Sequence, residues 1–472
     1  MKQKKRSFHM QTAYSILLAL ILIVAAVTWL IGGSVQRVSL AQVVMAVPRG
    51  FLDAIDVCLF ILFLGGFLGV VTATGALDRG IGALVRRLRG HEMVLIPILM
   101  VLFSLGGTTY GMAEETMAFY ALITATMVAA GFDAMVGAAV VLVGAGVGVL
   151  GSTVNPFAIS AAVDAYQSAY PGVTVDYGRI LLLGAVLWLT SLAAGIWLVM
   201  RYAAQVRKNG RSILTAAEQR QVRESYGQVE RVTEEEADLR LTGRQKASLV
   251  FFAVAFLVMV VALIPWEDFG VTWFAGTAWL TGEPLGAWYF QELEAWFFLA
   301  AIVVGLVACL GEQGIIDPFL RGAGDMIGVV FIIAISRGIS VVMSESGLDA
   351  WVLEQASSAL EQVSPALFVA GSYIIYLGLS FLIPSTSGLA AASMPTFAGL
   401  TAALGLSPEV MILIFCAACG VVNLIPPTSA VVMGGLSISR VEWHTWLRFI
   451  WKFLILLVVM NLVILSTAMY LL

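Results

Sequence analysis

The chain has 472 residues, of which 60% are hydrophobic and only 12% are charged, and its formal net charge is −4. Soluble domains are about 45–50% apolar and about 25% charged, so this composition excludes an ordinary soluble domain and favours a protein embedded in lipid. The small net charge and the lack of a compact basic patch also exclude nucleic-acid binding as the main function.

The N-terminal segment MKQKKRSFHM is basic, and an apolar run from Ala13 to Gly33 follows it. The apolar core of a signal peptide has about 7–15 residues and precedes a small-residue cleavage site, and this run is longer and has no such site. We therefore expect a first membrane-spanning helix with a cytoplasmic N-terminus.

Nine segments have the roughly 20 apolar residues that a full membrane span needs. Two further apolar stretches, 93–131 and 364–405, are too long for one helix, and small polar residues interrupt each near its middle. We expect each of these to form a re-entrant helical hairpin. The nine predicted spans are 11–32, 51–74, 134–165, 179–203, 247–264, 294–311, 323–343, 409–437 and 445–471.

The basic residues predict the orientation of the spans. Segments 1–10, 76–92 and 201–246 are rich in Lys and Arg, whereas 161–178 and 265–293 contain neither. Loops rich in Lys and Arg remain in the cytoplasm. With nine spans and two hairpins that return to their own side, we expect the N-terminus inside and the C-terminus outside.

The long polar stretch 204–246 carries both signs of charge, and we interpret it as a solvated cytoplasmic linker with some helix. It divides the chain into a first half, 1–203, and a second half, 294–472. A connecting span and an external loop, 247–293, lie between the linker and the second half.

The sequence predicts neither an enzyme nor a cofactor or metal site. His9, His91 and His444 all lie near predicted cytoplasmic loops, and no GxSxG, HExxH or Walker motif occurs. The cysteines lie in apolar stretches, where free Cys packs as a small hydrophobic residue. They are Cys58, Cys309, Cys416 and Cys419.

The two halves share motifs in the same order. TTYG at 108–111 lies in the middle of the first hairpin, and STSG at 385–388 lies in the middle of the second. GSTVNP at 151–156 and GVVN at 420–423 follow, the latter with Pro-Pro shortly after it. The predicted topology opens the first hairpin to the cytoplasm and the second to the outside, so the halves are inverted. Inverted repeats with interrupted helices predict a substrate site near the membrane midplane.

The interruptions have a physical use. Irregular backbone at membrane depth is tolerated where it is buried in protein or lines a cavity. A turn of Ser, Thr and Gly at a helix N-terminus presents N–H groups that favour negative charge. Asn155-Pro156 and Pro426-Pro427 leave backbone carbonyls free, and these can coordinate a cation.

GGTTYGMAEET at 106–116, STVNPF at 152–157 and NLIPPTS at 423–429 resemble the YfcC family. That family groups with the C4-dicarboxylate anaerobic carriers and with arginine/ornithine antiporter-like proteins in the wider ion transporter superfamily. The similarity covers nearly the whole chain, from GGFLGV at 65–70 to GGLSISRVEW at 434–443. It implies scaffold and transport domains, elevator-type alternating access and a homodimer in the bacterial inner membrane.

The resemblance also implies that substrate binds between the hairpin turns and the unwound helix centres. Sodium-coupled relatives often carry Ser-Asn-Thr at the turns, whereas this chain has Thr-Thr and Ser-Thr-Ser, so H⁺ and Na⁺ both stay open as the coupling ion. A sodium ion would lie near Asn155 and Asn423. The predicted binding residues are Thr108, Thr109, Gly111, Ser152, Thr153, Asn155 and Pro156 in the first half, and Ser385, Thr386, Ser387, Gly388, Asn423, Pro427, Thr428 and Ser429 in the second.

Three ionisable residues within predicted membrane segments complete the predicted site, because such residues are costly and functional by default. They are Glu114, Glu115 and Arg337. The guanidinium group suits carboxylate recognition, and the glutamates suit an ammonium group. We expect these groups to hold a zwitterionic or cationic amino acid. Alternatively, Arg337 forms an internal ion pair with one glutamate, or a glutamate carries a coupling proton.

The same residues bear on three alternatives, namely amino-acid transport, organic-anion transport and a channel. A C4-dicarboxylate or other organic anion would bring its negative charges against the two glutamates, so amino-acid transport is preferred to organic-anion transport. A channel is the alternative from a different class, but no ring of charged residues is evident. Asp53 and Asp56, near the start of a predicted span, are expected at the membrane interface.

Overall fold

The computed structural model describes residues 13–77, 79–80, 83, 91–113, 116–235, 241–263, 266–269, 271–358, 360, 363–383 and 385–472. All regular structure in these residues is helical, which confirms the prediction of an all-α protein. Seven of the described helical segments are long and apolar enough to cross a membrane by length and composition. They are 55–73, 92–109, 177–209, 243–263, 290–307, 311–346 and 443–471.

The seven long helices do not match the nine predicted spans one for one. Six of them overlap predicted spans, and the seventh, 92–109, is the first arm of the predicted hairpin 93–131. The predicted spans 134–165 and 409–437 are both interrupted, so neither forms a single long helix. The first interruption lies at Asn155-Pro156 and the second between Asn423 and Pro426-Pro427. Proline removes a backbone donor and clashes with the preceding turn.

A first group of helices, which we call the hairpin body, contains both predicted hairpins and the two interrupted spans 134–165 and 409–437. Its helices share one continuous apolar core. At its centre the backbones of α7 and α18 cross closely, because Gly420 has no side chain to meet Leu150. The hairpin body comprises α5 (Leu95–Tyr110), α6 (Met117–Ala129), α7 (Ala134–Leu150), α8 (Ala161–Ala169), α9 (Tyr177–Asn209), α16 (Pro365–Leu382), α17 (Thr386–Leu404), α18 (Pro408–Val422), α19 (Ala430–Ile438) and α20 (Trp443–Leu471).

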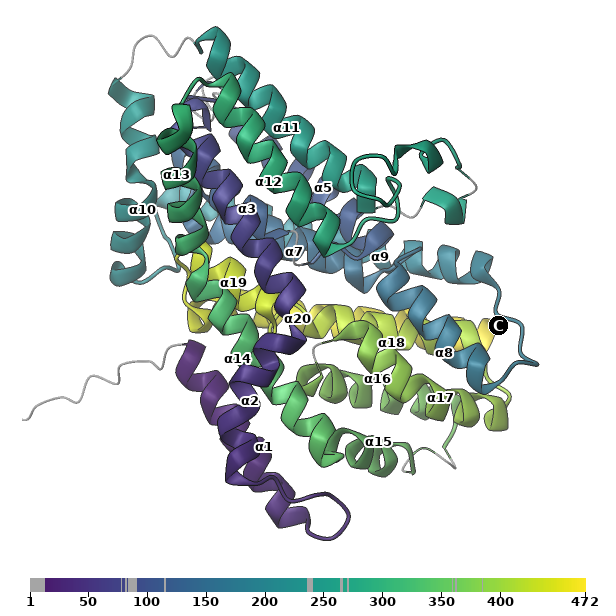
Figure 1. Cartoon of the computed structure of the whole chain (residues 1–472). Helices are drawn as coiled ribbons and strands as arrows, with labels where there is room; N and C mark the ends of the chain where they lie inside the picture. Colours follow the sequence, from purple (N-terminus) through teal and green to yellow (C-terminus); the bar gives the residue numbers. More distant parts are fainter. Residues whose placement is uncertain are drawn as a thin grey trace, which may run out of the picture.

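A second group, which we call the frame, has apolar cores of its own. Figure 1 shows α3, α12 and α13 packed side by side, with α1, α2 and α14 continuing away from them. The frame comprises α1 (Ala13–Ile31), α2 (Leu40–Asp53), α3 (Ile55–Ala73), α11 (Gly243–Leu263), α12 (Phe290–Val307), α13 (Gly311–Asp325) and α14 (Ile327–Ser346).

Two helix crossings in the frame are built alike. A side chain on Gly50 of α2 would meet the backbone of α14 at 2.3 Å, and one on Gly322 of α13 would meet the backbone of α3 at 2.2 Å. Small residues at such crossings let helix backbones touch, which is how helices pack tightly in membranes. The two halves of the chain therefore contribute matching α2–α14 and α13–α3 contacts to one rigid frame.

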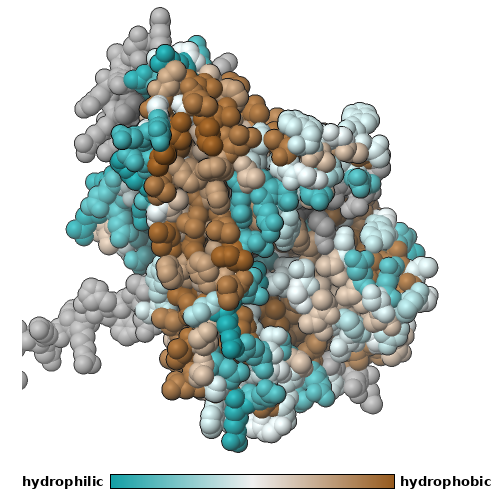
Figure 2. All heavy atoms as spheres, in the orientation of Figure 1, coloured by the Kyte–Doolittle hydropathy of each residue, from teal (hydrophilic) through white to brown (hydrophobic). Residues whose placement is uncertain are grey.

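The frame exposes large apolar side chains, among them Phe298 of α12, Leu320 of α13 and Phe331 of α14. Figure 2 shows a hydrophobic band running along this part of the molecule. Isolated exposed apolar residues are common in soluble proteins, but a continuous band of this extent is not. Such a surface suits contact with lipid.

The linker helix α10 (Ala216–Glu235) packs against the hairpin body. The Tyr226 hydroxyl donates a hydrogen bond to the Ile438 carbonyl at 2.6 Å. The side chain of Glu218 is completely buried and accepts hydrogen bonds from the backbone N–H of Glu442 and the hydroxyl of Thr445. The described part of the linker thus contains a helix that docks through one face, while most of residues 216–226 are exposed. The remaining helix, α15 (Leu348–Ser358), follows α14 directly.

Candidate functional site

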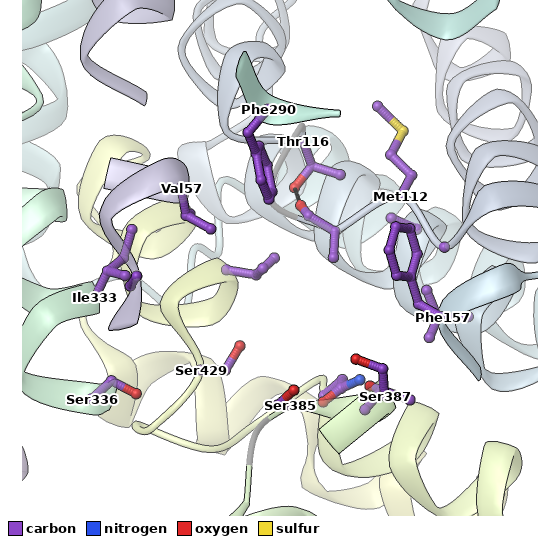
Figure 3. A pocket seen from close by; sticks show the side chains of 18 of the residues that line it. Val57, Met112, Thr116, Phe157, Phe290, Ile333, Ser336, Ser385, Ser387 and Ser429 are labelled. Carbon is purple, nitrogen blue, oxygen red and sulfur yellow. Dashed lines mark hydrogen bonds between the residues drawn. The ribbon is translucent and has the colours of Figure 1, made fainter. Parts of the chain in front are cut away.

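A cavity of about 280 Å³ lies where the helix interruptions of the hairpin body face the frame (Figure 3). Among the described lining residues, the hairpin body contributes most of the uncharged polar groups and the frame contributes the charged ones. The polar residues from the hairpin body are Thr116, Tyr120, Asn155, Ser385, Thr386, Ser387, Asn423, Thr428 and Ser429, and those in or beside the frame are Asp53, Asp56, Tyr289, Ser336 and Arg337.

Asn155 forms the first helix interruption next to the cavity. Its carboxamide oxygen accepts a hydrogen bond from the Phe157 N–H at 3.0 Å, and its nitrogen donates one to the Ser152 hydroxyl at 3.1 Å. Both polar ends of this side chain therefore hold the local backbone turn. A sodium ion at Asn155 would have to share the carboxamide oxygen with the hydrogen bond from the Phe157 N–H.

Several predicted binding residues in the first half bond inward and do not line the cavity. The Thr108 hydroxyl lies 3.1 Å from the Thr153 hydroxyl, which itself donates to the Thr108 carbonyl at 3.0 Å. The Thr109 and Ser152 hydroxyls donate to carbonyls of their own preceding helices, at 2.6 Å in both cases. Thr108 and Thr153 thus join the first hairpin to the first broken helix, while the Thr109 and Ser152 hydroxyls bond within their own helices.

The second half presents two helix N-termini at the cavity. The Ser385 hydroxyl accepts a hydrogen bond from the Gly388 N–H at 3.3 Å and caps α17, while Ser429 caps α19 through the Val432 N–H at 3.4 Å. Thr386 and Ser387, in the first turn of α17, line the cavity. The start of a helix carries free N–H groups and a partial positive charge. This wall can therefore bind a carboxylate.

The opposite wall of the cavity carries the charges. Asp53 ends α2, Asp56 begins α3, and Arg337 lies on α14. The Oδ2 atom of Asp53 lies 3.9 Å from Nε of Arg337. Within the described residues, the ion pair of Arg337 is thus with an aspartate of α2. Asp53 and Asp56, which the sequence predicts at the membrane interface, line the cavity.

Nine of the predicted site residues line the cavity. Gly388 and Pro427 lie beside it in the second half without lining it, and the side chain of Pro156 is not described. Glu114 and Glu115 lie outside the described residues. The nine lining residues are Gly111, Asn155, Arg337, Ser385, Thr386, Ser387, Asn423, Thr428 and Ser429.

The cavity also contains residues that the predicted site does not include. Asp53, Asp56 and Ser336 come from the frame, and the rings of Phe157 and Phe290 narrow the cavity from both bodies. The sequence feature that could identify the aspartates as cavity residues is their spacing, because two acidic residues stand three positions apart at the start of an apolar span. No comparable sequence signal marks the aromatic residues. Among the described residues, no group of three His, Cys, Asp or Glu could hold a metal ion.

The chain matches the family model of the C4-dicarboxylate anaerobic carriers (DcuC) over residues 33–470. It is 30% identical to the proposed basic amino acid antiporter YfcC of Escherichia coli (strain K12), over 84% of this chain and 74% of that protein. It is 26% identical to an uncharacterized protein of Haemophilus influenzae, over 89% of this chain and 77% of that protein.

Two solved structures resemble the fold over almost the whole chain. MtrF of Neisseria gonorrhoeae, described as one of a class of antimetabolite efflux pumps, has a TM-score of 0.44 at 13% identity and covers 98% of this chain and 96% of its own. The YdaH transporter of Alcanivorax borkumensis has a TM-score of 0.43 at 14% identity and covers 97% of this chain and 98% of its own.

Proposed function

This chain belongs to the C4-dicarboxylate anaerobic carrier family, and we propose that it is a secondary transporter that exchanges basic amino acids across the bacterial inner membrane. Family membership and the long apolar helices make it a multi-pass membrane transporter. We infer the substrate class, the exchange mode and the mechanism from the cavity and from the two bodies that form it.

The charge of the cavity carries the proposal. Among its described lining residues, two carboxylates, Asp53 and Asp56, face one guanidinium, Arg337. In a low-dielectric site, unlike charges attract strongly and an unbalanced charge is costly. A basic amino acid has two cationic groups and one carboxylate at neutral pH, so its charges complement these three side chains group by group.

The polar wall supports the same orientation of the substrate. The N-termini of α17 and α19 favour the substrate carboxylate, together with Arg337. The α-ammonium and side-chain cation then face the aspartates of the frame. Glu114 and Glu115 flank this site in the sequence, since their neighbours Ala113 and Thr116 both line the cavity.

Two bodies that each pack mainly around apolar cores of their own, and meet through Met117 and Met433, suit an elevator-type mechanism. In this proposal the hairpin body carries the substrate past the frame, and the frame forms a homodimer through its exposed apolar surface. The coupling ion is H⁺ or Na⁺. The inverted motifs of the two halves support such a cycle, because they make two related end states of similar energy accessible.

A C4-dicarboxylate carrier is the second candidate, and the name of the family model favours it. Arg337 and the two helix N-termini would bind the two carboxylates of such a substrate. The aspartates oppose it, because two further negative charges would face a dianion in one cavity. For this reason we rank it below basic amino acids.

The test is counterflow in liposomes that contain the purified protein. Liposomes are loaded with unlabelled arginine, ornithine or succinate, and the uptake of labelled arginine or succinate is then followed. We expect saturable arginine uptake that internal arginine or ornithine accelerates, and no succinate uptake. Succinate counterflow without arginine counterflow would replace the proposal with the dicarboxylate carrier, and uptake that fails to saturate would indicate a channel.

A further inference from the structure

The three charged residues of the cavity wall all belong to the frame. Asp53 and Asp56 lie at the junction of α2 and α3, and Arg337 lies on α14. The 3.9 Å separation between Asp53 and Arg337 exceeds the length of a hydrogen bond, which is about 3 Å. The side chains of Arg337 and Asp53 are 25% and 50% exposed. Both groups therefore keep hydrogen-bonding capacity for a ligand in the cavity.

The packing of the frame fixes these charges relative to one another. At the α2–α14 crossing, a side chain on Gly50 would lie 2.3 Å from the Ala334 carbonyl oxygen and the Gly338 nitrogen. At this crossing the two helices touch through their backbones, so α2 cannot slide along α14 without a clash. Asp53, one turn beyond Gly50, is thus held at a constant position opposite Arg337.

The facing wall belongs to the other body. Asn155, Ser385, Thr386 and Asn423 lie in the helix interruptions of the hairpin body. This body packs mainly around its own apolar core and reaches the cores of the frame through Met117 and Met433. A substrate in the cavity would therefore touch both bodies at once. If the hairpin body moves relative to the frame, the substrate stays with the polar wall of the hairpin body and leaves the charged wall of the frame.

We propose that Asp53, Asp56 and Arg337 form a stationary charged wall, which binds the substrate's cationic groups and carboxylate at one end of the transport cycle only. This inference rests on the proposed function and adds that the wall sets substrate affinity on one side of the membrane. In the predicted orientation α14 ends on the outer side, and α2 begins beside that end, because Gln42 Nε2 lies 3.4 Å from Glu345 Oε2. From there α2 runs inward to Asp53, opposite Arg337 in the middle of α14. Because α2 occupies the outer half of the frame, we assign the wall to the outward-facing end of the cycle, so the affinity that depends on it is the affinity for external substrate.

The proposal requires that the two walls respond differently to substitution. The polar wall of the hairpin body, with Asn155, Ser385, Thr386 and Asn423, is the travelling wall. Removing a charge from the stationary wall weakens substrate binding at one end of the cycle only. Removing a group from the travelling wall weakens substrate binding at both ends. Asp56 gives the cleaner variant on the stationary wall. It forms no ion pair or hydrogen bond recorded for the described residues, so that Asp56→Asn leaves no buried partner unsatisfied. Asp53→Asn is a second variant, and Asn423→Ala is the matched variant on the travelling wall.

The experiment measures the KM for arginine from each side, in right-side-out and inside-out membrane vesicles loaded with unlabelled arginine. We expect Asp56→Asn and Asp53→Asn to raise the external KM about 10-fold, the usual effect of losing one charge-assisted hydrogen bond, and to change the internal KM less than about twofold. Asn423→Ala is expected to raise both values.

Equal increases on both sides in the aspartate variants would overturn the proposal, because the wall would then accompany the substrate. An unchanged KM on both sides would also overturn it, because the wall would then not touch the substrate. A separate result of the same experiment tests the proposed function. If the wild-type vesicles show no arginine counterflow, basic amino-acid exchange itself is wrong, and the inference that depends on it is also lost.

Discussion

Gly111, at the turn of the first hairpin, lies directly against the carboxamide of Asn155 in the first broken helix. A Cβ atom built on Gly111 would stand 2.6 Å from Asn155 Oδ1, closer than real side chains approach one another. The backbone φ of Gly111 is +79°, in the left-handed region that glycine adopts without cost. Two independent constraints therefore require glycine where the hairpin meets the broken helix.

We expect Gly111→Ala to destabilise the protein by about 2–4 kcal/mol, since the left-handed conformation and the overpacking both contribute. Gly131 provides the control, because its φ is +83° and no atom lies within 4 Å of a Cβ there. Gly131→Ala should cost only the backbone strain, about 1 kcal/mol. Thermal unfolding in detergent measures both. Equal losses would mean that the contact with Asn155 is unimportant.

Asn155 and Asn423 occupy corresponding motifs but have different surroundings. Asn155 holds its turn through Phe157 and Ser152, so Asn155→Ala should lower stability by about 1–2 kcal/mol as well as transport. Asn423 lines the cavity, and no side-chain hydrogen bond is recorded for it among the described residues. Asn423→Ala should therefore reduce transport with little change in the unfolding midpoint. A midpoint that falls equally in both variants would contradict this difference.

The helix interruptions could be predicted from sequence because their cause is local. Clusters of small polar residues with Gly or Pro at membrane depth favour a helix break, so the interruptions near Gly111, Asn155, Ser385 and Asn423 are marked by the residues themselves. Single prolines such as Pro48, Pro318 and Pro395 stay inside helices. What the hydroxyls of these motifs do depends on burial. Thr108 bonds across to Thr153 and stays out of the cavity, although its motif is the same as that of Ser385.

The charged wall could not be predicted in the same way. Asp53 and Asp56 stand near the start of an apolar segment, where an acidic residue normally faces water at the membrane surface. Their place in the cavity follows from the crossing of α2 over α14, which brings Asp53 to Arg337, about 280 residues further along the chain. The crossing itself depends on single glycines, whose pattern is too sparse to stand out in a chain with 46 of them.

Two glycines of α13 allow a direct test of the frame. A Cβ on Gly322 would lie 2.2 Å from the carbonyl oxygen of Gly65 in α3, whereas one on Gly324 would meet nothing within 4 Å. Gly322→Ala should destabilise the protein by about 1–3 kcal/mol, because the two backbones must separate. Gly324→Ala should be neutral or stabilising by up to about 1 kcal/mol, because alanine favours the helix. If the variants unfold at the same temperature, the close crossing does not stabilise the frame.

Glu218 of the linker helix should be essential for docking α10 on the hairpin body. Its buried carboxylate accepts hydrogen bonds from the Thr215 N–H at 2.6 Å and the Glu442 N–H at 2.8 Å, and the second of these lies at the start of α20. Glu218→Ala leaves both N–H groups without this acceptor, at a cost of about 1–3 kcal/mol. Glu224→Ala, an exposed change two turns along the same helix, should cost less than about 0.5 kcal/mol.

The substrate affinity separates docking from a role at the binding site. Glu218 does not line the cavity, so the KM of Glu218→Ala for arginine should equal that of the wild type at temperatures where the variant is folded. The unfolding midpoint should nevertheless fall, because α10 joins the ends of α19 and α20 through Tyr226 and Glu218. A raised KM with an unchanged midpoint would instead mean that the linker helix acts on the site, and its docking would then be of little importance for stability.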